Sequence, residues 1–195
     1  MTQTDTQALL ASHALRLFLE HGYEGTSLSD LMKASGLSKG AVYHYFRSKE
    51  ELFEAAIEQF FLRFLPGEDS GVEAQKGLRA CVMAMVEGYC GMLAAVAEAT
   101  PDRLAYFRFL IAITPRIAPQ LQERLTLARQ QIVEAAMREQ EAGQLTRAVE
   151  PEDIADQCLA LIEGTGFLAT ISAEPGDEEQ ALRRIVGRFL DGLYR

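Results

Sequence analysis

Four cationic side chains are gathered in one short stretch of an otherwise acidic chain. Between residues 33 and 49 no aspartate or glutamate occurs, and the cations there are Lys33, Lys39, Arg47 and Lys49. They stand against a net charge of −9 for the whole chain, which leaves −13 elsewhere. A protein needs lysine or arginine where it meets the phosphates of a nucleic acid. The charge pattern therefore predicts a local nucleic-acid contact and argues against binding through bulk charge.

Residues 39 to 46, inside this basic stretch, are predicted to form a short helix with a small, aromatic and polar outer face. At helical spacing Val42 and Phe46 point toward a core. The residues left on or beside the outer face are Lys39, Gly40, Ala41, Tyr43, His44 and Tyr45. A helix enters the DNA major groove only where its leading residues are not bulky, a condition that Gly40 and Ala41 meet. This face is our candidate for base contact.

The elements that position this face are predicted to be helices. Apolar residues recur at helical spacing along the chain, and we find no convincing alternating strand pattern and no internal repeat, so the fold class is all-α. The first helices are expected at about residues 5–21, 27–36, 39–46 and 48–65. Serine followed by an acidic residue three positions later caps two of them, at Ser27 and Ser48. The second and third, joined by a short turn containing Gly36, make a helix-turn-helix.

The run PGEDSG at 66–71 predicts a domain boundary. Residues 1–65 are expected to form the DNA-binding domain, and 66–195 a larger helical bundle for ligand binding and dimerisation. In the bundle a long helix carries Leu78 to Val96. The next is expected to begin at Thr100 and Pro101 and to end around Pro115 and Pro119. Later helices are expected over about 119–142, from near Pro151, and over 182–193.

The stretch from Gly22 to Leu52, GYEGTSLSDLMKASGLSKGAVYHYFRSKEEL, resembles the DNA-binding segment of the tetracycline-repressor (TetR) family. The glycine after the first helix, the T-S opening, the turn over residues 34–40, the Y-H-Y-F run and S-K-E-E-L all stand at that family's spacing. The resemblance covers about residues 8–60. It implies a homodimer on a pseudo-palindromic operator, usually a repressor, with an inducer in the C-terminal core. By family position the outer-face residues named above would meet bases or flanking phosphates, while Ser27, Ser29 and Lys49 would clamp the DNA backbone.

Two departures from the family pattern bear on DNA affinity. Where the family usually has arginine or lysine before the first helix, this chain has Gln3, Thr4 and Gln7, and His13 stands where a small residue is usual. We therefore expect fewer phosphate contacts than in a member with a basic arm, and a shallower dependence of affinity on salt.

Two further sets of residues are candidates in the larger domain. Adaptable methionine and aromatic side chains suit an apolar ligand, with core packing as the alternative; they are Met85, Tyr89, Met92, Phe107 and Phe167. The apolar stripes of the last two long helices exceed what one bundle edge needs, and we expect them to pair across a two-fold axis. The residues expected in that interface are Leu161, Ile162, Leu168, Ile185, Phe189 and Leu193.

Other classes of protein are disfavoured. The chain has no H-E-x-x-H, no phosphate-binding glycine loop and no G-x-S-x-G, and its three histidines all lie in the first 44 residues, so neither an enzyme nor a metal or cofactor site is expected. Three cysteines without a C-x-x-C pair suit a reducing compartment. We expect no membrane-spanning stretch and a cytoplasmic protein. A helical adaptor that binds a protein partner stays open as the alternative function.

Overall fold

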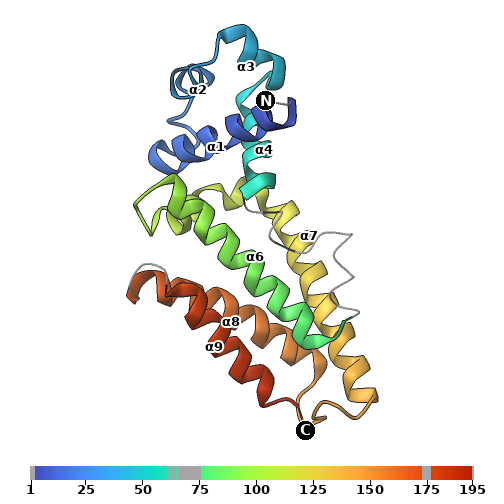
Figure 1. Ribbon diagram of the computed structural model, residues 1–195. Coiled ribbons are helices and arrows are strands. Elements are labelled where there is room, and N and C mark those ends of the chain that lie inside the picture. Colours follow the sequence, from blue (N-terminus) through green and yellow to red (C-terminus); the bar gives the residue numbers. More distant parts are fainter. Residues whose placement is uncertain (1–2, 61, 63–64, 66–75, 173–176, 195) are drawn as a thin grey trace. The chain divides into compact units, whose positions relative to one another are not determined.

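The structure is a computed structural model that describes residues 3–60, 62, 65, 76–172 and 177–194 (Figure 1). Its helices are α1 (Gln3–His21), α2 (Leu28–Ser35), α3 (Lys39–Tyr45), α4 (Lys49–Phe60), α6 (Leu78–Ala99), α7 (Ala105–Glu141), α8 (Pro151–Ser172) and α9 (Glu178–Asp191). Outside helices, the pairing found in the described residues is one isolated bridge between Leu145 and Tyr194. The predicted all-α class is confirmed.

The chain forms two compact units, each made of two separate stretches of the sequence. The first contains residues 1–63 and 92–118, and the second contains residues 64–91 and 119–195. Two helices therefore contribute to both units: α6 changes unit after Gly91, and α7 changes unit after Ala118. The expected functional division at residue 65 stays a prediction. The run 66–71 on which it depends lies outside the described residues.

Local caps build the helix-turn-helix as the sequence predicts. The Ser27 hydroxyl oxygen accepts from the Asp30 backbone N–H at 3.2 Å, and the Asp30 carboxylate accepts from the Ser27 N–H at 3.1 Å, which completes a capping box. Gly36 ends α2 with φ 69°, a left-handed conformation that glycine adopts without steric cost. Ser38 then caps α3 by accepting from the Ala41 N–H at 3.2 Å. These caps fix the turn between the two helices.

The start of α4 is also capped, with one difference. Ser48 accepts from the Glu51 N–H at 3.1 Å, as expected. The Glu51 carboxylate, however, accepts from the Arg47 N–H at 2.6 Å, one residue before the serine. Described α4 ends at Phe60; residues 61, 63 and 64 of the expected longer helix lie outside the described part.

An aromatic cluster forms part of the core of the first unit. Phe18 of α1 lies with its ring centroid 5.6 Å from that of Phe53 of α4 and 6.2 Å from that of Phe109 of α7. Tyr23, in the loop before α2, packs edge-on against Phe53 at 4.8 Å. The DNA-binding helices are thus packed against the first turns of α7.

The helix α7 differs from the sequence prediction at its start and in its middle. It begins at Ala105, because residues 100–104 form a turn in which the Asp102 carboxylate accepts from the Leu104 N–H at 3.0 Å. It then continues through Pro115 and Pro119, so the expected end there is wrong. A proline inside a helix costs about 3 kcal/mol. Buried Ile113 and Ile117 supply packing that offsets this cost.

In the second unit α8 packs along α9 (Figure 1). The α6 helix approaches α8 closely at Gly166: a Cβ added there would lie 2.3 Å from Cε1 of Tyr89. At the other end of the same segment of α6, the Leu78 N–H donates to Oε1 of Glu139 in α7 at 3.0 Å. The part of α6 that belongs to the second unit therefore packs against α8 near one end and bonds to α7 at the other.

Two helices have the length and apolar composition of a membrane span, contrary to the sequence expectation. They are α6 over Leu78–Ala99 and α8 over Pro151–Ile171, with hydropathies of 1.7 and 1.3 in their most apolar windows. Of these windows, 39% and 44% are buried inside the chain. Helices that pack on two sides are apolar around most of their circumference, so the same composition is typical of core helices.

Candidate nucleic-acid interface

The α3 helix presents the face that the sequence predicts. Val42 and Phe46 are buried and anchor it to the core. Lys39, Gly40, Tyr43 and His44 are exposed, while Ala41 and Tyr45 are half-buried. The Lys39 ammonium lies 5.7 Å from the Tyr43 ring centroid, and the rings of His44 and Tyr45 meet edge-on at 5.1 Å. The face therefore carries one cation and three aromatic or imidazole rings on a rigid short helix.

Gly40 is not required by the packing of the chain itself. A Cβ added to it would meet no atom within 4 Å, and its φ is not in the left-handed region. Glycine inside a helix costs roughly 0.5–1 kcal/mol relative to alanine. Gly40 therefore lowers the stability of the helix without serving a contact inside the chain. A glycine at this position would instead allow an outside molecule to approach the backbone closely.

We expect Gly40→Ala to stabilise the fold and to weaken DNA binding. The unfolding free energy should rise by roughly 0.5–1 kcal/mol through helix propensity. Affinity for the preferred DNA should fall by about 5- to 150-fold, the amount that one base contact contributes. Thermal unfolding and a mobility-shift titration measure the two effects. Gly187→Ala in α9, which also has open space around it, is the control that should leave DNA affinity unchanged.

The predicted backbone clamps at the start of α2 have different environments. The Ser27 hydroxyl already donates to Oδ2 of Asp30 at 2.6 Å. That hydrogen bond is the main reason why the pKa of Asp30 lies below its usual value, so the carboxylate is negative beside any phosphate placed there. Lys33 partly offsets this charge from 3.5 Å. Exposed Ser29 is therefore the better placed of the two serines for a phosphate oxygen.

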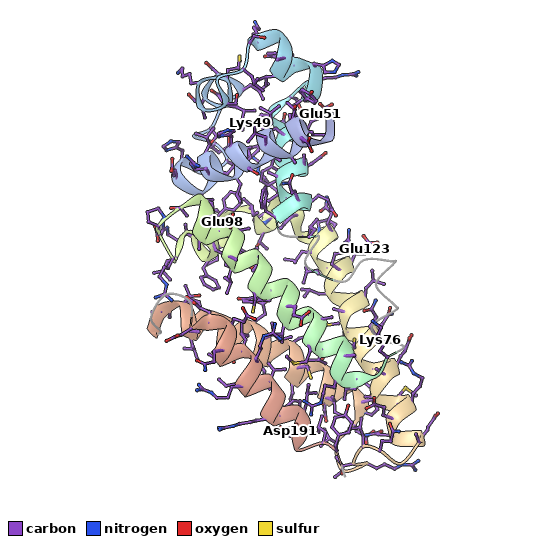
Figure 2. The ribbon with its side chains drawn as sticks, viewed as in Figure 1. Lys49, Glu51, Lys76, Glu98, Glu123 and Asp191 are labelled. Atoms are coloured by element: carbon purple, nitrogen blue, oxygen red, sulfur yellow. The ribbon has the colours of Figure 1, made fainter. Side chains whose placement is uncertain are left out.

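Lys49, the third predicted clamp, is half-buried at the first turn of α4 (Figure 2). Its ammonium lies 4.1 Å from the ring centroid of Tyr23 and donates to the Glu24 carbonyl oxygen at 3.5 Å. A cation over an aromatic face is held by the ring's quadrupole. Lys49 is therefore preorganised near the DNA-binding helices rather than extended into solvent.

Sequence reasoning missed the residues that surround Lys49. Arg116 of α7 places its guanidinium carbon 4.1 Å from the same Tyr23 ring centroid and pairs with Glu24 at 2.5 Å. The Tyr23 hydroxyl donates to Oε1 of Glu50 at 2.8 Å. Arg116 lies 92 positions from Glu24, and no local spacing pattern connects them.

The predicted ligand residues are divided between the two units. Met92 and Phe107 belong to the first, and Met85, Tyr89 and Phe167 to the second. Met85 and Tyr89 are buried, whereas Phe167 is exposed.

The sequence reading also missed Glu163 of α8, which lies near the Tyr89 hydroxyl. Solvent still reaches the Glu163 side chain in the single chain, but the neighbouring protein atoms displace enough water to raise its pKa. The nearby Tyr89 hydroxyl offsets this rise only in part. The second unit thus adds two neighbouring polar groups, the Tyr89 hydroxyl and the Glu163 carboxylate, to a mainly apolar set.

The six predicted interface residues also differ in exposure. Leu168 and Ile185 are exposed, Leu161 and Phe189 are half-buried, and Ile162 and Leu193 are buried inside the single chain. Ile171 of α8, which the sequence reading did not name, is exposed beside Leu168. The first four, with Ile171, are the residues that remain accessible to a second copy.

Two of the cysteines, Cys90 and Cys158, have thiols in poorly reactive surroundings. Burial raises the pKa of Cys158 to about 12 and that of Cys90 to about 11. The thiolate is the reactive form, so such pKa values suppress reaction at neutral pH. Within the described residues no group of three or more histidine, cysteine, aspartate or glutamate side chains is placed to hold a metal ion.

The chain is similar to known transcription regulators over the part that holds this interface. The model of the family "Bacterial regulatory proteins, tetR family" matches residues 10–56. The transcriptional repressor ComR of Escherichia coli is 24% identical over 181 residues, covering 91% of this chain and 83% of ComR. The repressor AcnR of Corynebacterium glutamicum is 36% identical over 77 residues, or 38% of this chain and 41% of AcnR. The chain thus spans less than two thirds of AcnR.

The fold is similar over nearly the whole chain. The structure of SmeT, solved as its triclosan complex, superposes with a TM-score of 0.70 at 18% identity and covers 97% of this chain and 92% of that chain. SmeT is the repressor of the Stenotrophomonas maltophilia multidrug efflux pump SmeDEF. The family match falls on the capped helix-turn-helix and its exposed α3 face, and the fold match extends through the helical remainder. The chain therefore carries a DNA-binding segment of the TetR family, within a fold similar to that of solved TetR-family regulators.

Proposed function

We propose that the protein is a homodimeric cytoplasmic repressor that reads an operator with α3 and is released when a small molecule binds in its helical remainder. The observation that carries the DNA-binding part is the face of α3. It is anchored by Val42 and Phe46, exposes Lys39, Tyr43 and His44, and keeps at Gly40 a glycine that the fold does not need. A two-fold dimer would present this face twice, to two half-sites about one helical turn apart.

Selection of duplexes from a random library by the wild-type protein tests the proposal directly. We expect enrichment of a pseudo-palindromic sequence, followed by a shift of the same sequence in the promoter that the protein controls. If no sequence is enriched over the starting library, the repressor proposal is wrong and the alternative of a helical adaptor gains support.

Substitutions should distinguish residues that read the base sequence from residues that only hold the DNA backbone. His44→Ala should cost more on the selected operator than on random DNA, because a base contact discriminates by roughly 1–3 kcal/mol. Lys49→Ala should weaken both kinds of DNA alike and flatten the salt slope by about 0.9 for each phosphate that is no longer neutralised. Competition shift assays against single-base operator variants at two salt concentrations measure both effects. Equal weakening by His44→Ala on every variant would show that His44 does not read sequence.

Effector binding is proposed for the apolar set that includes Met85, Tyr89 and Phe167, with the Tyr89 hydroxyl and the neighbouring Glu163 carboxylate as its polar element. An apolar or amphipathic molecule suits these side chains. SmeT, which shares this fold, is solved with triclosan, so triclosan is a reasonable first probe of the class. Coupling between two sites is reciprocal: an effector that weakens DNA binding by some factor must itself be weakened by DNA by that factor. Calorimetry with and without operator checks this equality.

A further inference from the structure

The ring of Tyr23 is approached by two cations from helices far apart in the sequence. The Lys49 ammonium of α4 and the Arg116 guanidinium carbon of α7 each lie 4.1 Å from the ring centroid. Tyr23 is itself buried, and its ring is 5.9 Å from that of Phe18. All of these residues belong to the first unit. The two cations therefore share a ring that packs against the core of this unit.

Two carboxylates balance the two cations. Arg116 pairs with Glu24 at 2.5 Å. Glu50 accepts a hydrogen bond from the Tyr23 hydroxyl, which is the main cause of a pKa below the usual value, so Glu50 is ionised at neutral pH. The cluster of Tyr23, Glu24, Lys49, Glu50 and Arg116 is thus neutral as a whole. Lys49 contacts the ring and a backbone carbonyl, and the carboxylate of Glu24 is occupied by Arg116.

The geometry points to Arg116 as a positioning residue for DNA binding: by pairing with Glu24, it leaves the ammonium of Lys49 available to a phosphate. This inference rests on the proposed phosphate contact of Lys49. Without Arg116 the Glu24 carboxylate loses its cation. The Lys49 ammonium, which is already 3.5 Å from the Glu24 backbone carbonyl oxygen, is then close enough to form an ion pair with the Glu24 carboxylate. The cluster also gains a net negative charge where the DNA backbone would approach.

An arginine suits this position better than other residues. Its planar guanidinium can stack on an aromatic ring while its N–H groups pair with a carboxylate. Lysine would keep the charge and lose the planar stack. Glutamine would keep much of the length and lose the charge. Comparing arginine, lysine and glutamine at position 116 therefore distinguishes the effect of the charge from the effect of the planar stacking.

The experiment uses the full-length protein and the duplex that the wild type selects, with a random duplex of equal length beside it. Arg116→Gln should weaken binding to both duplexes by about two- to fivefold per half-site, the effect of an exposed charge pair. It should also flatten the salt slope, because Lys49 no longer meets a phosphate. Arg116→Lys should retain most of the wild-type affinity. Adding Glu24→Gln to Arg116→Gln should restore affinity, because the unpaired carboxylate is gone.

A double-mutant cycle with Lys49→Ala tests whether Lys49 is the mediator. In the Lys49→Ala background Arg116→Gln should weaken binding no further. Equal weakening in both backgrounds, or no recovery with Glu24→Gln, would overturn the proposal and indicate that Arg116 touches DNA itself. A lowered melting temperature with an unchanged salt slope would also overturn it, in favour of a purely structural role.

The same measurements separate this inference from the proposed function. If Lys49→Ala leaves DNA affinity unchanged, Lys49 makes no phosphate contact and the role assigned to Arg116 is wrong. Sequence-selective binding by the wild type would then still support the repressor. If the wild type selects no duplex at all, the repressor proposal itself is wrong.

Discussion

Leu168→Glu is expected to convert the protein to monomers and to lower operator affinity by about 10²- to 10⁴-fold, the range over which linking two binding sites raises affinity. Leu168 is 62% exposed in the single chain and lies on α8 near exposed Ile171. In the proposed dimer this stripe is buried against a second copy, and a buried unpaired carboxylate is strongly unfavourable. Each monomer would then hold only one half-site. Light scattering and a shift titration measure the two effects.

Ile111→Glu is the matched control for this experiment. Ile111 is even more exposed, at 75%, but it belongs to the first unit, whereas the proposed stripe on α8 and α9 belongs to the second. The variant should leave the protein dimeric. A Leu168→Glu protein that scatters light as a dimer would rule out α8 as part of the interface.

Gly166→Ala is expected to destabilise the second unit substantially. The added Cβ would lie 2.3 Å from Cε1, 2.6 Å from the hydroxyl oxygen and 2.7 Å from Cζ of Tyr89. These atoms belong to a ring that is buried and cannot move aside freely. Overpacking of this kind costs roughly 1–3 kcal/mol. At about 2–4 °C per kcal/mol for a chain of this size, the fall in melting temperature is readily measured.

The control for Gly166→Ala is Gly187→Ala in α9. A Cβ there would meet no atom within 4 Å, so only the gain in helix propensity remains. Gly187 also lies two positions from Ile185, which places it on the other side of α9 from the proposed interface. The melting temperature of the Gly187→Ala protein should equal or exceed that of the wild type. A Gly166→Ala protein as stable as the wild type would show that Tyr89 repacks at little cost.

The parts of the fold that depend on short-range chemistry were predictable from the sequence. Ser27, Asp30 and Gly36 specify a cap and a turn through contacts between residues at most four positions apart, and these contacts are present. The outward face of α3 follows from helical spacing around Val42 and Phe46. The resemblance of this segment to the TetR family followed from the same residues.

The parts that depend on distant residues were not predictable in this way. From Pro115 and Pro119 we expected a helix to end, but α7 continues through both residues because tertiary packing stabilises it. The pairing of Arg116 with Glu24 depends on contacts between residues 92 positions apart. The sequence gives no sign that Glu163 lies near Tyr89, because only the packing of α6 on α8 brings these residues together.

The two prolines of α7 also affect how that helix can bend. In an α-helix the N–H of each residue donates to the carbonyl four positions earlier, so Pro115 and Pro119 leave the carbonyls of Ile111 and Pro115 without that donor. These carbonyls lie one turn apart on the same edge, at positions exposed to water. Bending that opens this edge therefore breaks fewer hydrogen bonds than bending in the opposite direction. Arg116 lies between the two prolines, so a bend of α7 at this point would tilt its guanidinium relative to the Tyr23 ring.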